Sequence, residues 1–223
     1  MPQQPTTPQL PRPAGVILAG GLSRRMFGPE PGPGDKTLLP LGATTMLGHV
    51  ISRFGPQVAS LVLNANGDPA RFAAFGLPIV ADTIGGFVGP LAGVLAGLRW
   101  AGATQPAATH VVTVSADAPF LPEDLVARLM AAAVEQPHAV VMARSNGALH
   151  PVIAAWPVVH ADHLEAALTS GVRKVLLWTD EHGTVPVDFD HLVIGGETID
   201  PFFNANTPAE LEEARRLLVV QRP

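Results

Sequence analysis

The chain contains no cysteine, which excludes disulfide bonds, a thiolate nucleophile and zinc or iron–sulfur sites held by cysteine. It also has no excess of basic residues, because 14 Lys and Arg stand against 19 Asp and Glu, for a formal net charge of −5. A surface that coats nucleic acid neutralises phosphates with Lys and Arg. We therefore expect no nucleic acid among the partners.

Long hydrophobic runs are missing as well. No uninterrupted apolar segment reaches the roughly 18–20 residues that span a bilayer, and the amino terminus lacks the basic-then-apolar pattern of a signal peptide. We therefore expect a protein without membrane contact. The absence of cysteine fits a reducing compartment, so the expected location is the cytoplasm.

The composition indicates one sizeable globular domain, with 223 residues of which 47% are hydrophobic. Residues 1–14 are an exception: they read MPQQPTTPQLPRPA, with five prolines and few apolar side chains. Such a segment buries too little apolar surface to offset its ordering entropy. We predict a disordered tail over 1–14 and a single domain over 15–223.

Short apolar runs alternate with segments of helical spacing along this domain. The runs, each predicted to be a strand, cover 15–19, 58–63, 77–80, 110–114 and 139–143. The segments with helical spacing include 45–54, 89–100 and 122–134. Alternating strands and helices predict an α/β domain of three layers, with a mostly parallel sheet between helices.

The first predicted strand leads directly into a loop rich in glycine and positive charge. Gly20 and Gly21 allow backbone N–H groups to approach a phosphate closely. A hydroxyl donor and three cations follow within the same connection: Ser23, Arg24, Arg25 and Lys36. This combination favours a polyphosphate ligand, since Arg grips phosphate oxygens with two bonds and Lys acts as a point charge. The alternative is a tight turn with solvated charges.

Acidic and amide side chains follow three of the predicted strands. Asp117 ends an apolar strand, where a lone carboxylate is well placed to hold Mg²⁺ while a nucleotide supplies other oxygens. Its alternative role is to make a turn or to cap a helix. Asp82 and Asn64 are open to the same two interpretations, ligand contact or turn formation.

Six segments carry a resemblance to a known family. They are Leu18–Met26 (LAGGLSRRM) followed by Asp35-Lys36, Asn64-Ala65-Asn66, Gly89–Gly93 (GPLAG), His150-Pro151, Arg173-Lys174-Val175 and Phe203–Pro208 (FNANTP). In this order they resemble the molybdenum cofactor guanylyltransferases of the nucleotidyltransferase superfamily. The resemblance implies a Rossmann-like fold, GTP and Mg²⁺, and transfer of GMP to the terminal phosphate of molybdopterin with release of pyrophosphate.

The resemblance also implies roles for single residues. It assigns the GTP phosphates to Leu18, Ala19, Gly20, Gly21, Arg25 and Lys36, the nucleoside to Asn64 and Asp82, magnesium to Asp117, and molybdopterin to Asn204 and Asn206. Arg25, Lys36 and Asp117 would then be the catalytic residues, acting by position and charge. For Asn204 and Asn206 a second role is equally attractive. They precede Thr207-Pro208-Ala209-Glu210, a sequence typical of a capped helix start.

The sequence departs from the family pattern between Met26 and Asp35, where the eight residues 27–34 form an unusually long connection. A second departure is Ala118-Pro119 after the metal-binding acid, where the family more often has Thr-Pro. Implied partners besides the two substrates are molybdenum-insertion proteins and recipient molybdoenzymes, in transient contact. The rival functions are a cytidylyltransferase of the same pathway and a non-catalytic module that binds nucleotide or cofactor.

Two further motif residues stay open. His150 lies where a hairpin-like return is expected, and it is either a hydrogen-bonded turn residue or a ligand. Arg173 and Lys174 are expected in a helical segment after Gly171, either on a solvated face or in contact with the phosphate of the second substrate.

Overall fold

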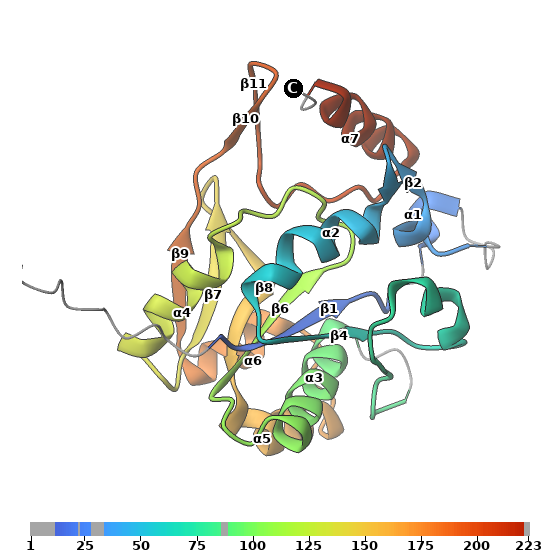
Figure 1. Ribbon diagram of the computed structural model, residues 1–223. Coiled ribbons are helices and arrows are strands. Elements are labelled where there is room, and N and C mark those ends of the chain that lie inside the picture. The colour runs from blue at the N-terminus through green and yellow to red at the C-terminus, as the bar shows by residue number, and fades with distance from the viewer. Residues whose placement is uncertain (1–11, 22, 28–33, 86–88, 221–223) are drawn as a thin grey trace, which may run out of the picture.

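The computed structural model describes residues 12–21, 23–27, 34–85 and 89–220 (Figure 1). A seven-stranded sheet with the order β5-β4-β1-β6-β8-β7-β9 forms its centre. The strands are β1 Ala14–Leu18, β4 Ser60–Asn64, β5 Ile79–Val80, β6 His110–Ser115, β7 Val140–Ser145, β8 Ala148–Pro157 and β9 Thr184–Asp188. Of the tail predicted to be disordered, residues 1–11 lie outside the described residues.

The sheet is mostly parallel, as predicted. β1 pairs in parallel with β4 and β6, β4 with β5, and β7 with β9. β8 runs antiparallel to both of its neighbours, β6 and β7. It returns from β7 through Asn146-Gly147, both with positive φ as a two-residue hairpin turn requires. The hairpin thus places an antiparallel strand inside an otherwise parallel sheet.

Helices cover both faces of the sheet and complete the three predicted layers. One face carries α2 (Met46–Phe54) and α4 (Leu125–Glu135), and the other carries α3 (Pro90–Thr104), α5 (Ala161–Thr169) and α6 (Val175–His182). Figure 1 shows α3, α5 and α6 together below the sheet. Adjacent residues Val16 and Ile17 of β1 belong to opposite core clusters and are both fully buried. The strands therefore read as continuous apolar runs instead of alternating ones.

A third hydrophobic cluster lies at one end of the molecule, where α7 (Pro208–Val220) packs with two small hairpins (Figure 1). The hairpins are β2 (Pro40–Leu41) with β3 (Thr44–Thr45), and β10 (Leu192–Ile194) with β11 (Glu197–Ile199). Short helical segments complete the structure: α1 Arg24–Phe27, η1 Lys36–Leu38, η2 Gly55–Gln57, η3 Pro69–Phe75 and η4 Val158–His160. The third cluster ties the carboxyl-terminal part to the loop region after β1.

Two local predictions were wrong. Arg173 and Lys174 are not helical, because α6 begins at Val175 and Lys174 is its N-cap; both side chains are exposed. His150-Pro151 is not in a turn, because the hairpin-like return falls on Asn146-Gly147 and His150 lies within β8. In both cases the apolar pattern marks the element but not the residue at which it begins.

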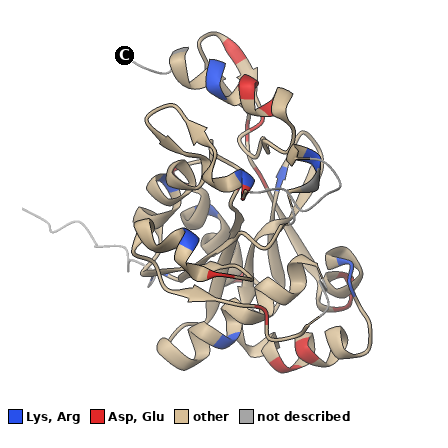
Figure 2. Cartoon of the chain, turned by 90° about the vertical axis from the view of Figure 1, so that its right-hand side faces the viewer, with Lys and Arg blue, Asp and Glu red and all other residues tan. Residues whose placement is uncertain are grey.

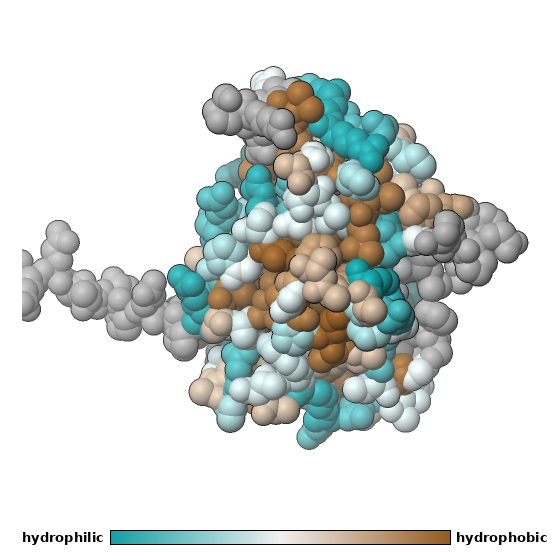
Figure 3. Space-filling model, turned by 45° about the vertical axis from the view of Figure 1, so that its right-hand side comes forward, coloured by the Kyte–Doolittle hydropathy of each residue, from teal (hydrophilic) through white to brown (hydrophobic). Residues whose placement is uncertain are grey.

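Along the described part of the chain, Lys and Arg residues and Asp and Glu residues are both distributed over the fold instead of being gathered in one basic region (Figure 2). On the face drawn in Figure 3, apolar side chains occupy the middle and hydrophilic ones surround them. In the described part of the chain, no helix combines the length and the apolarity needed to cross a membrane.

Candidate active site

The carboxyl ends of β1, β4 and β6 meet at one edge of the sheet, where Leu18 is in register with both Asn64 and Ser115. A cavity of about 320 Å³ opens at this edge. Of the residues predicted to bind nucleotide, all except Arg25 line it: Leu18, Ala19, Gly20, Gly21, Lys36, Asn64, Asp82 and Asp117. The topology thus brings together side chains from four connections that lie far apart in sequence.

The Gly20-Gly21 turn forms one wall of the cavity. It is fixed at its base, since the Ala19 amide donates to the Asn64 carbonyl at 2.8 Å. A Cβ added at Gly21 would meet no described atom within 4 Å, so the backbone of this turn is open to a ligand. The loop returns to the cavity through Ser23, whose hydroxyl accepts the Lys36 amide at 3.2 Å. Residues 28–33 of the long connection lie outside the described part of the chain.

Lys36 and Asp117 meet at the cavity and form an ion pair. The Lys36 ammonium group donates to the Asp117 carboxylate and, at 2.6 Å, to the Asn206 side-chain oxygen. Each side chain of the pair is only 11% exposed. Asp35 fixes the backbone beside the lysine, because its carboxylate caps η1 by accepting the Thr37 amide at 3.0 Å. A nearly buried cation is thereby satisfied by two oxygen acceptors.

Asp117 is also held from its other side. The Ser115 hydroxyl donates to Asp117 Oδ1. Asn204, in the amide orientation that satisfies its hydrogen bonds, donates to the same oxygen at 3.3 Å and to the Phe202 carbonyl at 3.2 Å. The Ala205 amide donates to the Asp117 carbonyl at 3.1 Å. The carboxylate therefore has a fixed orientation toward the cavity.

Asp82 accepts hydrogen bonds from two asparagine amides across the cavity. Asn64 Nδ2 donates to Asp82 Oδ1 at 2.9 Å, and Asn66 Nδ2 donates to Oδ2 at 2.8 Å. The Asp82 amide returns a bond to Asn66 Oδ1 at 2.9 Å. Sequence reasoning gave Asn66 no role, although its spacing of two from Asn64 was the available signal. Ser115 and Thr37 line the cavity as well and were likewise missed.

Helix α3 approaches this asparagine pair closely because Gly93 has no side chain. A Cβ at Gly93 would lie 2.2 Å from Asn64 Oδ1 and 2.8 Å from Leu18 Cδ2. One turn along, a Cβ at Gly97 would lie 2.6 Å from Val16 Cγ2. The glycines of α3 thus allow its amino-terminal turn, with Gly93, to line the cavity.

Arg25, Asn204 and Asn206 surround the Lys36–Asp117 pair instead of lining the cavity that the described residues form. Arg25 Nη2 donates to Asn206 Oδ1 at 3.0 Å, so this oxygen accepts from two cations. The three predicted catalytic residues and the two predicted pterin-binding asparagines therefore form one connected group.

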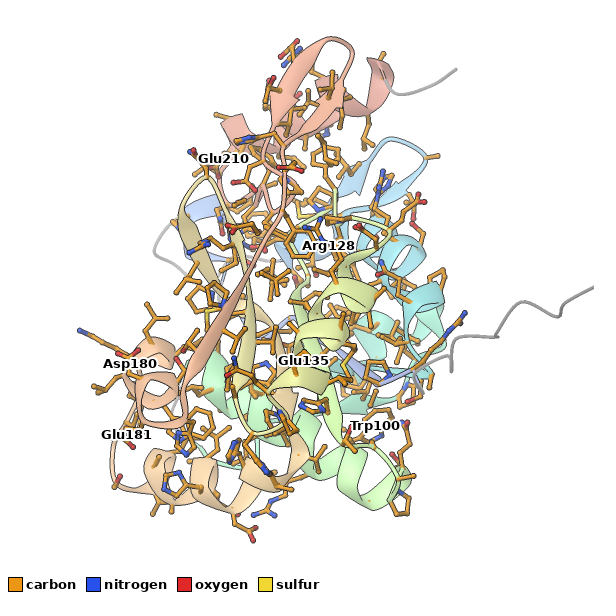
Figure 4. All side chains as sticks on the ribbon, turned by 90° about the vertical axis from the view of Figure 1, so that its left-hand side faces the viewer. Trp100, Arg128, Glu135, Asp180, Glu181 and Glu210 are labelled. Atoms are coloured by element: carbon orange, nitrogen blue, oxygen red, sulfur yellow. The ribbon has the colours of Figure 1, made fainter. Side chains whose placement is uncertain are left out.

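Asn206 also takes part in the cap of α7, where it donates to Glu210, the residue labelled in Figure 4. Glu210 Oε2 accepts the Asn206 and Thr207 amides, each at 2.8 Å, and the Glu210 amide donates back to the Thr207 hydroxyl at 3.3 Å. This is the predicted capping box. Burial alone would raise the pKa of Glu210, but these hydrogen bonds outweigh burial and lower it. The backbone of Asn206 caps the helix while its side chain faces the cations, so the cap leaves the side chain free of that task and the molybdopterin contact stays a prediction.

The donor set at Asp117 is sparse. Among the residues that the structure describes, no three His, Cys, Asp or Glu side chains are grouped closely enough to hold a metal ion. Asp117, with Ser115 beside it, offers one carboxylate and one hydroxyl. Such a set fits a hard cation that takes its remaining oxygens from a bound ligand.

Comparison with known proteins gives a consistent result. Residues 15–184 match the family model described as the MobA-like NTP transferase domain. The molybdenum cofactor guanylyltransferase of Mesorhizobium japonicum is 50% identical over 92% of this chain and 95% of its own length. That of a Bradyrhizobium species is 49% identical over 93% of each chain. The crystal structure of molybdopterin-guanine dinucleotide biosynthesis protein A from Archaeoglobus fulgidus is similar in fold, with a TM-score of 0.68 and 20% identity over 92% of this chain and 98% of that one.

Proposed function

The chain belongs to the molybdenum cofactor guanylyltransferase family, and from this premise we propose how its cavity transfers GMP from GTP to molybdopterin. One observation carries the proposal. The glycine turn, the Asn64–Asp82 pair and the Lys36–Asp117 pair line a single cavity at the carboxyl edge of the sheet.

We propose that the triphosphate lies along the Gly20-Gly21 turn. Backbone N–H groups at such a turn bind phosphate oxygens, and the Lys36 ammonium group at the same cavity supplies positive charge. Arg25 adds a second positive charge beside Asn206, because its guanidinium group donates to the Asn206 side-chain oxygen. Lys36 would exchange one of its present oxygen acceptors for a phosphate oxygen.

The nucleoside then extends toward Asp82. Each Asp82 carboxylate oxygen accepts one asparagine N–H and keeps further acceptor capacity. Guanine presents two adjacent N–H donors on one edge, which match a carboxylate, whereas cytosine presents acceptors beside its amino group. This chemistry supports GTP over CTP as the substrate.

The cation in this proposal is Mg²⁺, held by Asp117 and phosphate oxygens. When bound, it neutralises phosphate charge during the displacement at the α-phosphorus. The protein's own residues position the triphosphate and stabilise the negative charge that develops on the leaving pyrophosphate. Lys36 and Arg25 perform this role as preorganised cations.

The acceptor molybdopterin would lie beside Asn204 and Asn206, with its terminal phosphate oxygen directed at the α-phosphorus. Asn206 is suited to this because its side chain is linked to both Lys36 and Arg25. No covalent enzyme intermediate is required, and catalysis rests on position and charge. We also propose that the protein acts in the cytoplasm. There it would make transient contact with molybdenum-insertion proteins and with recipient molybdoenzymes.

Incubation of the purified protein with molybdopterin, Mg²⁺ and either GTP or CTP tests the proposal. We expect pyrophosphate and a dinucleotide product with GTP, and little of either with CTP. Preference for CTP would identify a cytidylyltransferase instead. Nucleotide binding without pyrophosphate release would identify a non-catalytic module.

A further inference from the structure

The β7–β8 hairpin is irregular next to the cavity. Met142 pairs with Ala154 and Arg144 pairs with Leu149, so one residue of β7 faces the four residues 150–153 of β8. Pro151 lies in this bulge, where its missing N–H costs no regular ladder bond. Bulges beside active sites redirect side chains. Here the bulge contains Val152, which lines the cavity, and His150.

His150 takes part in a hydrogen-bonded chain with Ser145 and Asp200. The Ser145 hydroxyl lies 2.6 Å from His150 Nε2 and donates to Asp200 Oδ2 at 2.7 Å. Because an ionised carboxylate can only accept, the single hydroxyl proton goes to Asp200 and His150 must donate through Nε2–H. Ser145 is 1% exposed, and burial lowers the pKa of His150 despite the nearby Asp200. At neutral pH the ring is therefore a neutral donor.

The second oxygen of Asp200 organises the segment that follows it. Asp200 Oδ1 accepts the Phe202 amide at 2.8 Å, and the Asp200 carbonyl accepts the Phe203 amide at 3.0 Å. The ring of Phe202, itself buried, packs on the His150 ring with centroids 4.6 Å apart. Ser145 and His150 thus hold the turn 200–203 in place from the side of the sheet.

This turn leads directly to the asparagines beside the catalytic pair. Asn204 contacts Asp117 Oδ1 and the Phe202 carbonyl, and Asn206 contacts Lys36. A displacement of the turn would move both asparagines relative to Asp117. On the nucleotide side, the contacts that join β1 to β4 and fix the base of the glycine turn involve no residue of the turn 200–203.

We infer that Ser145, His150 and Asp200 are positioning residues for the acceptor substrate: they fix the 200–206 segment and so set the affinity for molybdopterin without touching the reacting atoms. The inference rests on the proposed function, because it takes Asn204 and Asn206 to be the acceptor site. In this inference, His150 of the His-Pro motif acts by holding the segment that contains the acceptor-binding asparagines.

Steady-state kinetics of Ser145→Ala test the inference. We expect the KM for molybdopterin to rise on the order of tenfold, the effect of losing one or two hydrogen bonds, while the KM for GTP changes less than about twofold. Asp200→Asn keeps one acceptor oxygen, which can still accept the Phe202 amide, so it should retain more affinity for molybdopterin than Asp200→Ala.

Thr179→Val is the matched control, because Thr179 is also a fully buried hydroxyl but belongs to α6, where it contacts the Leu176 carbonyl. It should leave both KM values unchanged. If Ser145→Ala raises both KM values equally, or neither, the inference is wrong.

Backbone hydrogen exchange gives a second readout that does not depend on turnover. We expect faster exchange of the Phe202, Phe203 and Ala205 amides in Ser145→Ala and no change there in Thr179→Val. Unchanged exchange in Ser145→Ala would overturn the inference even if the wild-type protein transfers GMP. Absence of GMP transfer by the wild type would instead contradict the proposed function.

Discussion

Lys36 forms an ion pair with Asp117, 81 residues further along the chain, and its ammonium group also reaches Asn206 at 2.6 Å. One lysine therefore joins the loop after β1, the end of β6 and the segment before α7. Both members of the pair are proposed to bind other groups during the reaction, Lys36 a phosphate and Asp117 a cation. Ligand binding must then compete with their contact, which links the phosphate and cation sites.

Lys36→Met should change the affinities of the cation site and the phosphate site in opposite directions. Removal of the ammonium group frees the Asp117 carboxylate, so we expect tighter Mn²⁺ binding in the absence of nucleotide. GTP should bind on the order of tenfold to a hundredfold more weakly, as for a lost charged hydrogen bond. Isothermal titration calorimetry measures both affinities. The control is Lys174→Met, because Lys174 is the only other lysine of the sequence and its side chain is exposed; this substitution should change neither the Mn²⁺ affinity nor the GTP affinity. Unaltered Mn²⁺ affinity in Lys36→Met would show that the ion pair does not restrain Asp117.

Gly93→Ala should impair nucleotide binding by displacing Asn64. The new Cβ would lie 2.2 Å from Asn64 Oδ1, so Asn64 must shift and weaken its bond to Asp82. We expect weaker GTP binding and a loss of about 1–3 kcal/mol in unfolding free energy, measured by denaturant titration. Gly102→Ala lies on the same helix, where a Cβ meets no described atom within 4 Å. It should raise stability by about 0.5–1 kcal/mol through helix propensity. Equal effects of the two substitutions would refute the proposed clash.

Glu210→Gln should destabilise the protein only when Glu210 is ionised in the wild type. The folded-state pKa of Glu210 lies below its ordinary value of 4.5. A carboxylate with a lowered pKa stabilises the folded state above its unfolded-state pKa, and this contribution is lost as pH falls through the folded-state pKa. We expect a deficit of about 1 kcal/mol at pH 7 that shrinks below pH 4.5. Urea unfolding at both pH values measures it.

The control for this pH series is Glu212→Gln on the same helix. Glu212 pairs with Arg215 at the surface, and its side chain is 69% exposed, so its contribution to stability should be small. A Glu210→Gln deficit that stays constant from neutral to acidic pH would mean that the capping carboxylate acts without its charge.

Local sequence patterns predicted those parts of the fold that are determined by residues close together in the sequence. The apolar run at 15–19 becomes β1 because both of its faces are covered, and Thr207 and Glu210 form the capping box that their spacing of three indicates. The convergence of Leu18, Asn64 and Asp117 also followed from sequence, since parallel strands end at one edge of the sheet.

Long-range contacts were not predictable in the same way. Ser145 and Asp200 are 55 residues apart, and no local pattern relates them. β9 contains Pro186, which argues against a strand, yet it is tolerated because β9 is the edge of the sheet. The bulge at His150 depends on how β8 pairs with β7, and apolar periodicity does not specify that register.

A crystal structure of the protein with GTP and Mg²⁺ tests the central claim most directly. We predict that the triphosphate contacts the Gly20-Gly21 backbone and Lys36, that the cation binds Asp117, and that the guanine edge faces Asp82. A nucleotide bound elsewhere, with Lys36 and Asp117 still paired and neither contacting phosphate or cation, would contradict the account.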